Sequence, residues 1–585
     1  MLSKLSPFIL GSAMASAPST EPATLLVNLK GLSQEDQITV QACAGLLNRD
    51  VSVAGPVYTL RRQDDDHWWS IFKKGKQYRS VSFTEFTSIC QNSGVAKGVI
   101  RYDVKADNES IPQLFTMAAV LDGVPYSTES KIPLMKDGTQ PKMLFDVSKE
   151  WTGFDSYAAT EYLFKNHINE TTGLAKMDPG FQRKIVNPKV TGTADVGLGD
   201  YIVQKKIFNM YMLNSCIPLT KDHALFEKIA TQNPWPRPIA VMGYDSTYDI
   251  FGGTIFEAET NCVSQHNMGQ IASSGVNNFS YFSRVKPISE PLAQPYAGVS
   301  TTFDKNKTYM AFVVGDGDNT GYIKGSRKDW FDSRTAYCTK QQAAGKECFP
   351  LLWTMSPQLL HLAPEMISWY YNESYKTKAD TFVLPPSGDL YSYPGTMLEN
   401  EQLNHARNTE RDCELMSTAA TVHWEWFYQW NQAIDTYFPK FSSKNIVKAF
   451  FGVAVPYLIP IIPCDTYFCI HKNLFTIIND NTILFRPREW RGTDESKAPP
   501  LAGKDYLTPE KFAGEINGYK RGSVGYVYLT SDGGFTIQNL YDMVAQLDDH
   551  VEVVNFNTLV EMALASHKAG LGDDEQEKSV QEFLV

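Results

Sequence analysis

The sequence has no run of about 18 uncharged apolar residues, so no membrane-spanning helix is expected. Residues 449–463 come nearest, but three prolines interrupt that stretch, and proline breaks a helix interior. Basic residues are fewer than acidic ones: the sequence has 54 Lys and Arg and 65 Asp and Glu, which gives a formal net charge of −11. A surface of that sign repels nucleic-acid phosphates and anionic lipids. Neither partner is therefore expected.

Several chemistry-bearing motifs are missing as well. No GxGxxG opens a βαβ unit and no GxxxxGK[ST] occurs, so oxidoreductase and kinase functions have little support. The nine cysteines contain no CxxC, and the ten histidines show no ligand spacing, which argues against a zinc site. The cysteine spacing instead favours local disulfides, Cys338–Cys348 and Cys464–Cys469, with buried free thiols as the alternative.

The N-terminus has the features of a secretory signal peptide over residues 1–17. Lys4 supplies a positive charge, residues 5–14 are mostly apolar, and residues 13–17 offer two A-x-A cleavage sites. An unstructured terminus is the alternative. A secreted or endomembrane-lumen glycoprotein is expected, although N-x-S/T sequons such as that at Asn108 arise at this frequency by chance.

The 585 residues, 43% of them hydrophobic, provide for three or four domains. Three prolines within residues 233–238 mark a boundary. Before it, strand–helix patterns predict three small α/β modules, and after it the pattern predicts one larger domain and an acidic tail. The expected units are residues 22–92, 93–145, 146–232, 236–567 and 568–585.

The larger domain contains eight apolar runs of strand length, several followed by helical segments with good start signals. The runs are residues 239–243, 310–314, 350–353, 381–384, 449–455, 482–485, 524–529 and 551–554. Alternating strands and helices favour a parallel sheet, here an irregular (β/α)8 TIM-like barrel, with an open doubly wound sheet as the alternative. Residues 423–426 (HWEW) are interpreted as an aromatic helical stretch with an exposed glutamate.

In a barrel, functional side chains follow the strands at their C-terminal ends. The sharpest signal there is residues 315–319 (GDGDN), where glycines allow a tight turn that brings Asp316 and Asp318 together. We interpret one of them as a catalytic carboxylate. A divalent-cation site at Asp316 and Asp318 is a second interpretation, and a solvated turn is a third. No other cofactor is expected.

A glycosidase needs a second carboxylate, and Glu489 is the leading candidate. The competing interpretation is an ion pair with a neighbouring arginine. Other strand-end side chains are candidates for holding sugar hydroxyls or for stacking on sugar rings. The predicted substrate-binding residues are Asp245, Asn319, Trp353, Ser387, Asp389, Tyr391, Tyr393, Arg486, Trp490 and Asp532.

Residues 387–394 (SGDLYSYP) resemble the signature of the GxGYxYxP family of putative glycoside hydrolases. Residues 41–49 (QACAGLLNR), 314–319, 353–357 and 486–490 also resemble family segments, in the same order. The resemblance spans about residues 24–560 and implies N-terminal modules followed by a barrel-like catalytic domain. Leu390 stands where the signature has its second glycine.

Three functional hypotheses follow. The first is a secreted glycoside hydrolase that cleaves a poly- or oligosaccharide through paired carboxylates. The second is a noncatalytic carbohydrate-binding or surface-interaction protein on the same scaffold, which the Leu390 substitution would fit. The third is a divalent-metal-assisted hydrolase. Fold alone does not choose among them.

Overall fold

The computed structural model describes eleven stretches of the chain, and the statements below concern only these. They are residues 22–177, 197–212, 214–243, 256–273, 275–295, 302–426, 429–453, 473–479, 482–498, 503–530 and 535–571. The predicted signal peptide and residues 572–585 of the predicted tail lie outside them. In these stretches no helix has the length and apolar character needed to cross a membrane.

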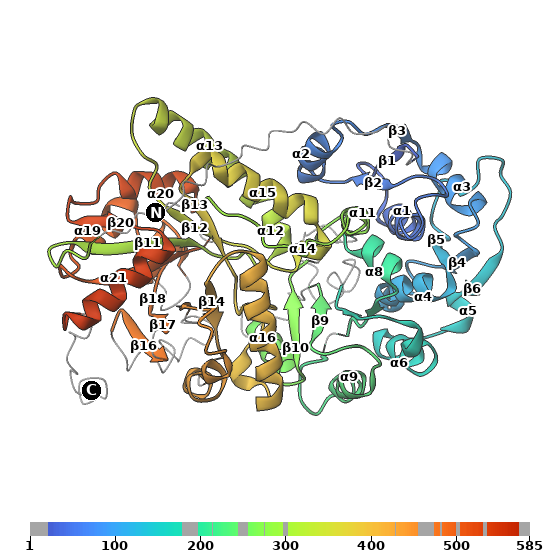
Figure 1. Cartoon of the computed structure of the whole chain (residues 1–585). Helices are drawn as coiled ribbons and strands as arrows, with labels where there is room; N and C mark the ends of the chain where they lie inside the picture. The colour runs from blue at the N-terminus through green and yellow to red at the C-terminus, as the bar shows by residue number, and fades with distance from the viewer. Residues whose placement is uncertain are drawn as a thin grey trace, which may run out of the picture.

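Two three-stranded parallel sheets form the N-terminal part of the molecule (Figure 1). The first, ordered β2-β1-β3, contains β1 (Thr24–Asn28), β2 (Val57–Leu60) and β3 (Tyr78–Val81), with helices α1 (Gln34–Leu47), α2 (Gln63–Phe72) and α3 (Phe83–Asn92). The second, ordered β5-β4-β6, contains β4 (Gly98–Tyr102), β5 (Gly123–Ser127) and β6 (Met143–Asp146), with α4 (Leu114–Leu121) and α5 (Val147–Glu150). Serine caps at Ser33 and Ser82 start α1 and α3.

A third parallel sheet, ordered β10-β9-β7-β8, lies between these modules and the C-terminal part (Figure 1). Its strands are β7 (Leu174–Ala175), β8 (Phe208–Asn209), β9 (Ile239–Met242) and β10 (Met268–Ile271). The helices in this stretch of the chain are α6 (Ser156–His167), α8 (Gly199–Lys205), α9 (Lys221–Gln232), α10 (Phe256–Ser264) and α11 (Phe279–Phe282). The prediction that β9 opens a barrel is wrong, because β9 pairs with β7 and β10 across the proline-rich segment.

The C-terminal part holds two further sheets. The six-stranded parallel sheet runs β13-β12-β11-β19-β18, and β20 pairs with β11. Its strands are β11 (Thr308–Val314), β12 (Leu351–Thr354), β13 (Asp380–Val383), β18 (Pro487–Trp490), β19 (Val524–Leu529) and β20 (Val551–Val553). The other sheet runs β14-β15-β17-β16, with β14 (Ala420–Trp424), β15 (Ala449–Val453), β16 (Phe475–Asn479) and β17 (Thr482–Phe485).

These two sheets share one core. Alternating side chains of β11, such as Ala311 and Val313, pack in the same cluster as Val422 of β14 and Phe451 of β15. One parallel bridge, Leu384 to Thr421, joins the sheets. The described hydrogen-bond ladders do not close into a ring, so the predicted TIM-like barrel is not confirmed. The α/β class with parallel strands is confirmed.

Helices α13 (Ser326–Ala343), α15 (Pro364–Thr377), α19 (Pro509–Asn517) and α20 (Ile537–Val544) pack on the outer face of the six-stranded sheet (Figure 1). Helix α21 (Phe556–Lys568) instead packs in the core that the two sheets share. The other helices of this part are α12 (Thr320–Lys324), α14 (Leu359–Leu362), α16 (Glu399–Leu415) and α17 (Gln429–Gln432). The predicted disulfide Cys338–Cys348 is present, while Cys464 and Cys469 lie outside the described residues. A second disulfide, Cys216–Cys262, was not predicted.

Candidate functional site

The GDGDN turn lies where β11, β19 and β18 end side by side. In the parallel register Val314 stands beside Leu529, and Leu529 stands beside Trp490. The N–H of Gly315 continues the ladder by donating to the Leu529 carbonyl at 2.7 Å. Side chains that follow these strands therefore gather at one edge of the sheet, as expected for a functional site in an α/β protein.

The two glycines of the turn are required by close contacts. A β-carbon at Gly315 would lie 2.2 Å from Cζ of Tyr528, and one at Gly317 would lie 2.0 Å from the Thr354 carbonyl oxygen. The left-handed residue of the turn is Asp316, with φ +59°. The sequence therefore placed the tight turn correctly, but the glycines provide room for neighbours, and the aspartate takes the left-handed conformation.

Hydrogen bonds from two other strands hold the turn. The Asp316 N–H donates to the Tyr528 phenol oxygen at 3.1 Å, and the Gly317 N–H donates to Oγ1 of Thr354 at 2.9 Å. The Asp316 carboxylate lies 3.5 Å from the buried Arg327 guanidinium and remains 25% exposed. Burial and the charges of Asp316 and Asp318 raise the pKa of Tyr528 well above its usual value. Both carboxylates therefore act on this phenol.

Glu489 projects from β18 toward the same region. Its α-carbon pairs with that of Tyr528, which pairs with Val313 of β11, so these three side chains share one face of the sheet. Two strand spacings, roughly 10 Å, separate the Glu489 backbone from β11. The carboxylate is 4% exposed and forms an ion pair with Arg491. The alternative prediction of an ion pair with a neighbouring arginine is thus confirmed.

The prediction that Trp353 and Trp490 are stacking platforms is wrong, because both side chains point away from this edge. The Trp353 indole packs against Phe331 at 5.0 Å between ring centres and donates to Asp380 at 3.0 Å. Trp490 stacks on Phe512 of α19 at 4.5 Å and is fully buried. Strand alternation explains the second case, because residues 489 and 490 face opposite sides of the sheet.

The signature segment is part of the core. Both Ser387 and Asp389 are buried: the serine hydroxyl bonds the Trp424 backbone at 3.0 Å, and the aspartate accepts from Gln358 at 2.8 Å and Asn408 at 3.0 Å. Ser387 and Asp389 were predicted to bind sugar hydroxyls, but in the structure their side chains bond to other parts of the protein.

The signature tyrosines join neighbouring parts of the fold. Tyr391 exchanges backbone hydrogen bonds with Gln270 of β10 at 2.8 and 3.1 Å. Its ring contacts Trp424 edge-on with ring centres 6.0 Å apart, and Tyr393 lies 6.2 Å from it. Both rings are buried in the core shared by the two C-terminal sheets. The structure thus places them inside that core.

The remaining predicted residues have mixed outcomes. Asn319 caps α12, where its side-chain oxygen accepts the N–H of Gly321 at 2.9 Å. Arg486 is half-buried just after β17. Asp245 and Asp532 lie outside the described residues. Among the described residues, no group of three His, Cys, Asp or Glu side chains is arranged to hold a metal ion.

Residues 423–426 were assigned incorrectly. His423 lies on β14 rather than on a helix, and its Nε2 contacts a Glu425 oxygen at 2.8 Å. Glu425 is completely buried and accepts the Gly395 N–H at 2.9 Å, so the prediction of an exposed glutamate is also wrong. The alternation of Ala420, Val422 and Trp424 into the core was the available sequence signal.

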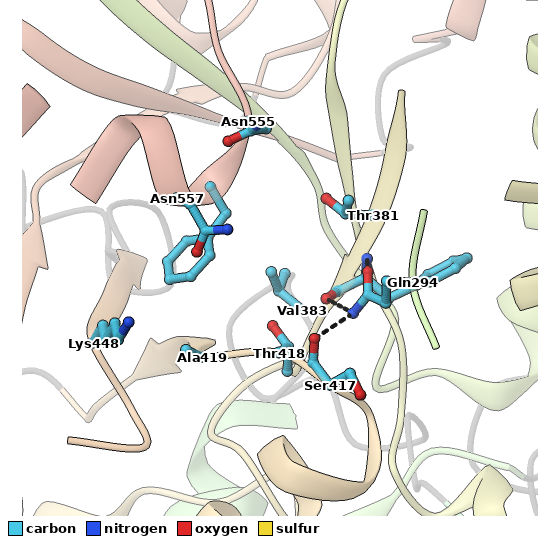
Figure 2. Close-up of a pocket in the computed structure, with 11 residues that line it drawn as sticks. Gln294, Thr381, Val383, Ser417, Thr418, Ala419, Lys448, Asn555 and Asn557 are labelled. Atoms are coloured by element: carbon cyan, nitrogen blue, oxygen red, sulfur yellow. Dashed lines mark hydrogen bonds between the residues drawn. The ribbon is translucent and has the colours of Figure 1, made fainter. Parts of the chain in front are cut away.

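A pocket of about 240 Å³ lies where β13, β14 and β15 begin and β20 ends (Figure 2). Thr381 at the start of β13, Lys448 just before β15 and Asn557 at the start of α21 line it. In Figure 2 the side chains of Thr381, Thr418 and Asn557 surround Val383. None of the predicted site residues lines this pocket. The candidate site therefore rests on the geometry around Tyr528.

Comparisons with known proteins agree with the resemblance. Residues 306–471 match the family model described as the GxGYxYP putative glycoside hydrolase C-terminal domain, which confirms the predicted recognition over that range. The whole fold resembles the crystal structure of a putative hydrolase from Bacteroides thetaiotaomicron. That likeness has a TM-score of 0.72 at 18% identity, and covers 93% of this chain and 95% of the other. No curated protein matches the chain.

Proposed function

We propose that the chain is a secreted glycoside hydrolase whose reaction takes place at the edge formed by β11, β19 and β18. Two observations support the proposal: the charges of Asp316 and Asp318 act on Tyr528, and Glu489 pairs with Tyr528 in the strand register on the same face of the sheet. Glycosidases use two carboxyl groups on either side of the scissile bond. The family match over residues 306–471 supports the same reaction class.

The two kinds of carboxyl group have different roles in this proposal. Arg491 stabilises the Glu489 carboxylate in its charged form, so Glu489 acts as the base or nucleophile. The proton for the leaving oxygen then comes from the GDGDN turn, with Asp318 as the first candidate because Asp316 lies 3.5 Å from the Arg327 guanidinium. The exposure of the Asp316 side chain supports access to a substrate from solvent. The disulfides Cys216–Cys262 and Cys338–Cys348 support folding in an oxidising compartment.

A hydrolysis screen on a broad glycan panel tests this function. It compares the native chain with Glu489→Gln, Asp316→Asn and Asp318→Asn, each checked for intact folding. Loss of one catalytic carboxyl group should reduce the rate by at least about 100-fold while glycan binding persists. The matched control is Glu259→Gln, because Glu259 of α10 is also buried and paired with a cation, Lys176, which directly follows β7.

The other two hypotheses predict different outcomes in the same screen. A noncatalytic binding protein would retain glycans and cleave none of them. A divalent cation at Asp316 and Asp318 would make cleavage sensitive to a chelator and restorable by added Mg²⁺ or Ca²⁺. Cleavage that survives all three carboxyl variants would overturn the assigned site.

A further inference from the structure

Lys324 ends the short helix that directly follows the GDGDN turn, and its charge is neutralised by another module. The Lys324 ammonium lies 2.8 Å from Asp64 and also forms an ion pair with Asp65, both on α2 of the first N-terminal module. The Lys324 side chain is 1% exposed and that of Asp65 is 0% exposed. This buried pair therefore joins segments about 260 residues apart in the chain.

Asp65 contacts three separate parts of the molecule. Its carboxylate accepts the N–H groups of Arg61 and Arg62 at 2.9 Å each and the Asn277 amide at 3.0 Å, in addition to Lys324. Burial alone would raise the pKa of Asp65, but Lys324 and these donors hold it below its usual value. The carboxylate is thus kept charged, although it has no contact with solvent.

The helix α12 is held at both of its ends. At its start, the N–H and hydroxyl of Thr320 both donate to the Ala272 carbonyl at 2.9 Å. At its end, the Trp68 indole donates to the Lys324 carbonyl at 2.7 Å. The helix has only five residues, so it is too short to bend independently of the turn that precedes it.

We propose that Asp65 and Lys324 are positioning residues for the GDGDN turn, so that the first N-terminal module completes the candidate active site. The pair fixes α12, and α12 carries Asn319, its cap, directly beside Asp318. The catalytic part of this inference rests on the proposed function. The mechanical part stands on the contacts alone, and an experiment that needs no substrate tests it.

The first measurement is hydrogen exchange of the amides in residues 316–324 of the full chain. Asp65→Asn and Lys324→Met should speed exchange there by about tenfold, because the local opening that permits exchange becomes easier. Lys324→Arg should restore part of the protection. The matched control is Lys176→Met, which breaks the buried pair between Lys176, directly after β7, and Glu259 of α10 and should leave exchange over residues 316–324 unchanged.

The second measurement separates positioning from a general loss of stability. On a substrate found in the glycan screen, Asp65→Asn should lower kcat by about 100-fold with little change in KM. If the native chain cleaves no glycan, the proposed function fails, and exchange alone still decides the positioning role. Should the charge variants fail to fold, Trp68→Phe removes the hydrogen bond to the Lys324 carbonyl and part of a buried indole, but no buried charge. Unchanged exchange over residues 316–324 in a folded variant overturns the inference.

Discussion

The Leu390 side chain occupies the space that a side chain at Gly269 would need. A β-carbon at residue 269 would lie 2.3 Å from the Leu390 β-carbon, and Leu390 is only 4% exposed. Residue 390 is the position at which this chain departs from the family signature. The departure is therefore accommodated by the absence of a side chain on the facing strand β10.

The contact between Gly269 and Leu390 predicts that substitutions at the two positions have non-additive effects on stability. Gly269→Ala should destabilise the fold by about 1–3 kcal/mol through overpacking. Leu390→Gly should destabilise it by about 2–5 kcal/mol because it leaves a cavity. In the double variant the alanine at residue 269 no longer meets a side chain at residue 390. The double variant should therefore lose less folding stability than the two single variants together. Urea denaturation of the four proteins measures this, and strict additivity would contradict the contact.

The Gly315–Tyr528 contact predicts a second effect. Gly315→Ala should displace the Tyr528 ring, lower stability by about 1–3 kcal/mol and impair any activity of the turn. Gly514→Ala is the control, because that glycine lies inside α19 with nothing near its missing β-carbon. The control should be about 0.5–1 kcal/mol more stable than the native chain. Thermal denaturation compares the two, and equal melting temperatures would refute the prediction.

The Glu489–Arg491 pair predicts that replacing Arg491 destabilises the fold by an amount that depends on pH. Arg491→Met removes the ion-pair partner of a buried carboxylate and should lower the free energy of unfolding by about 3–5 kcal/mol near neutral pH. The loss should shrink as the pH falls, because a protonated carboxyl group needs no counter-charge. Chemical denaturation at several pH values measures it. A loss that is the same at all pH values would show that Glu489 does not depend on Arg491 for its charge.

Asp200 predicts a pH dependence of native stability itself. Burial raises the pKa of Asp200 to about 7, despite hydrogen bonds from the Ser280 hydroxyl and N–H. Above the unfolded pKa, near 3.8, the unfolded chain ionises while the folded group stays protonated, so stability falls as the pH rises toward 7. Lowering the pH from 7 therefore stabilises the native chain through protonation of Asp200.

Asp200→Asn should remove that penalty. The stability advantage of the variant over the native chain should grow by about 2–3 kcal/mol between pH 5 and pH 8, at 1.36 kcal/mol per pKa unit. Denaturant titrations at both pH values give the comparison. A constant difference between the two proteins would mean that Asp200 is charged in the folded state.

Local sequence patterns determined much of this protein. Runs of β-branched and aromatic residues predicted β11, β12, β13, β15, β17 and β19, because a strand buried on both faces is an almost uninterrupted apolar run. The short strand β20 was predicted too, although it is only partly buried. Short-range spacing also located the Cys338–Cys348 disulfide. The GDGDN turn was found for the same reason, because glycine and aspartate after a strand are a local signal.

Only the tertiary structure decided which side chains share a space. Glu489 faces the site and Trp490 faces α19 because the strand register sets the orientation of each residue, and register depends on distant partners. The membership of β9 in the third sheet, the space for Leu390 beside Gly269 and the pairing of Asp65 with Lys324 are contacts of the same kind. Each joins segments far apart in the chain, and packing between them is invisible to a local pattern.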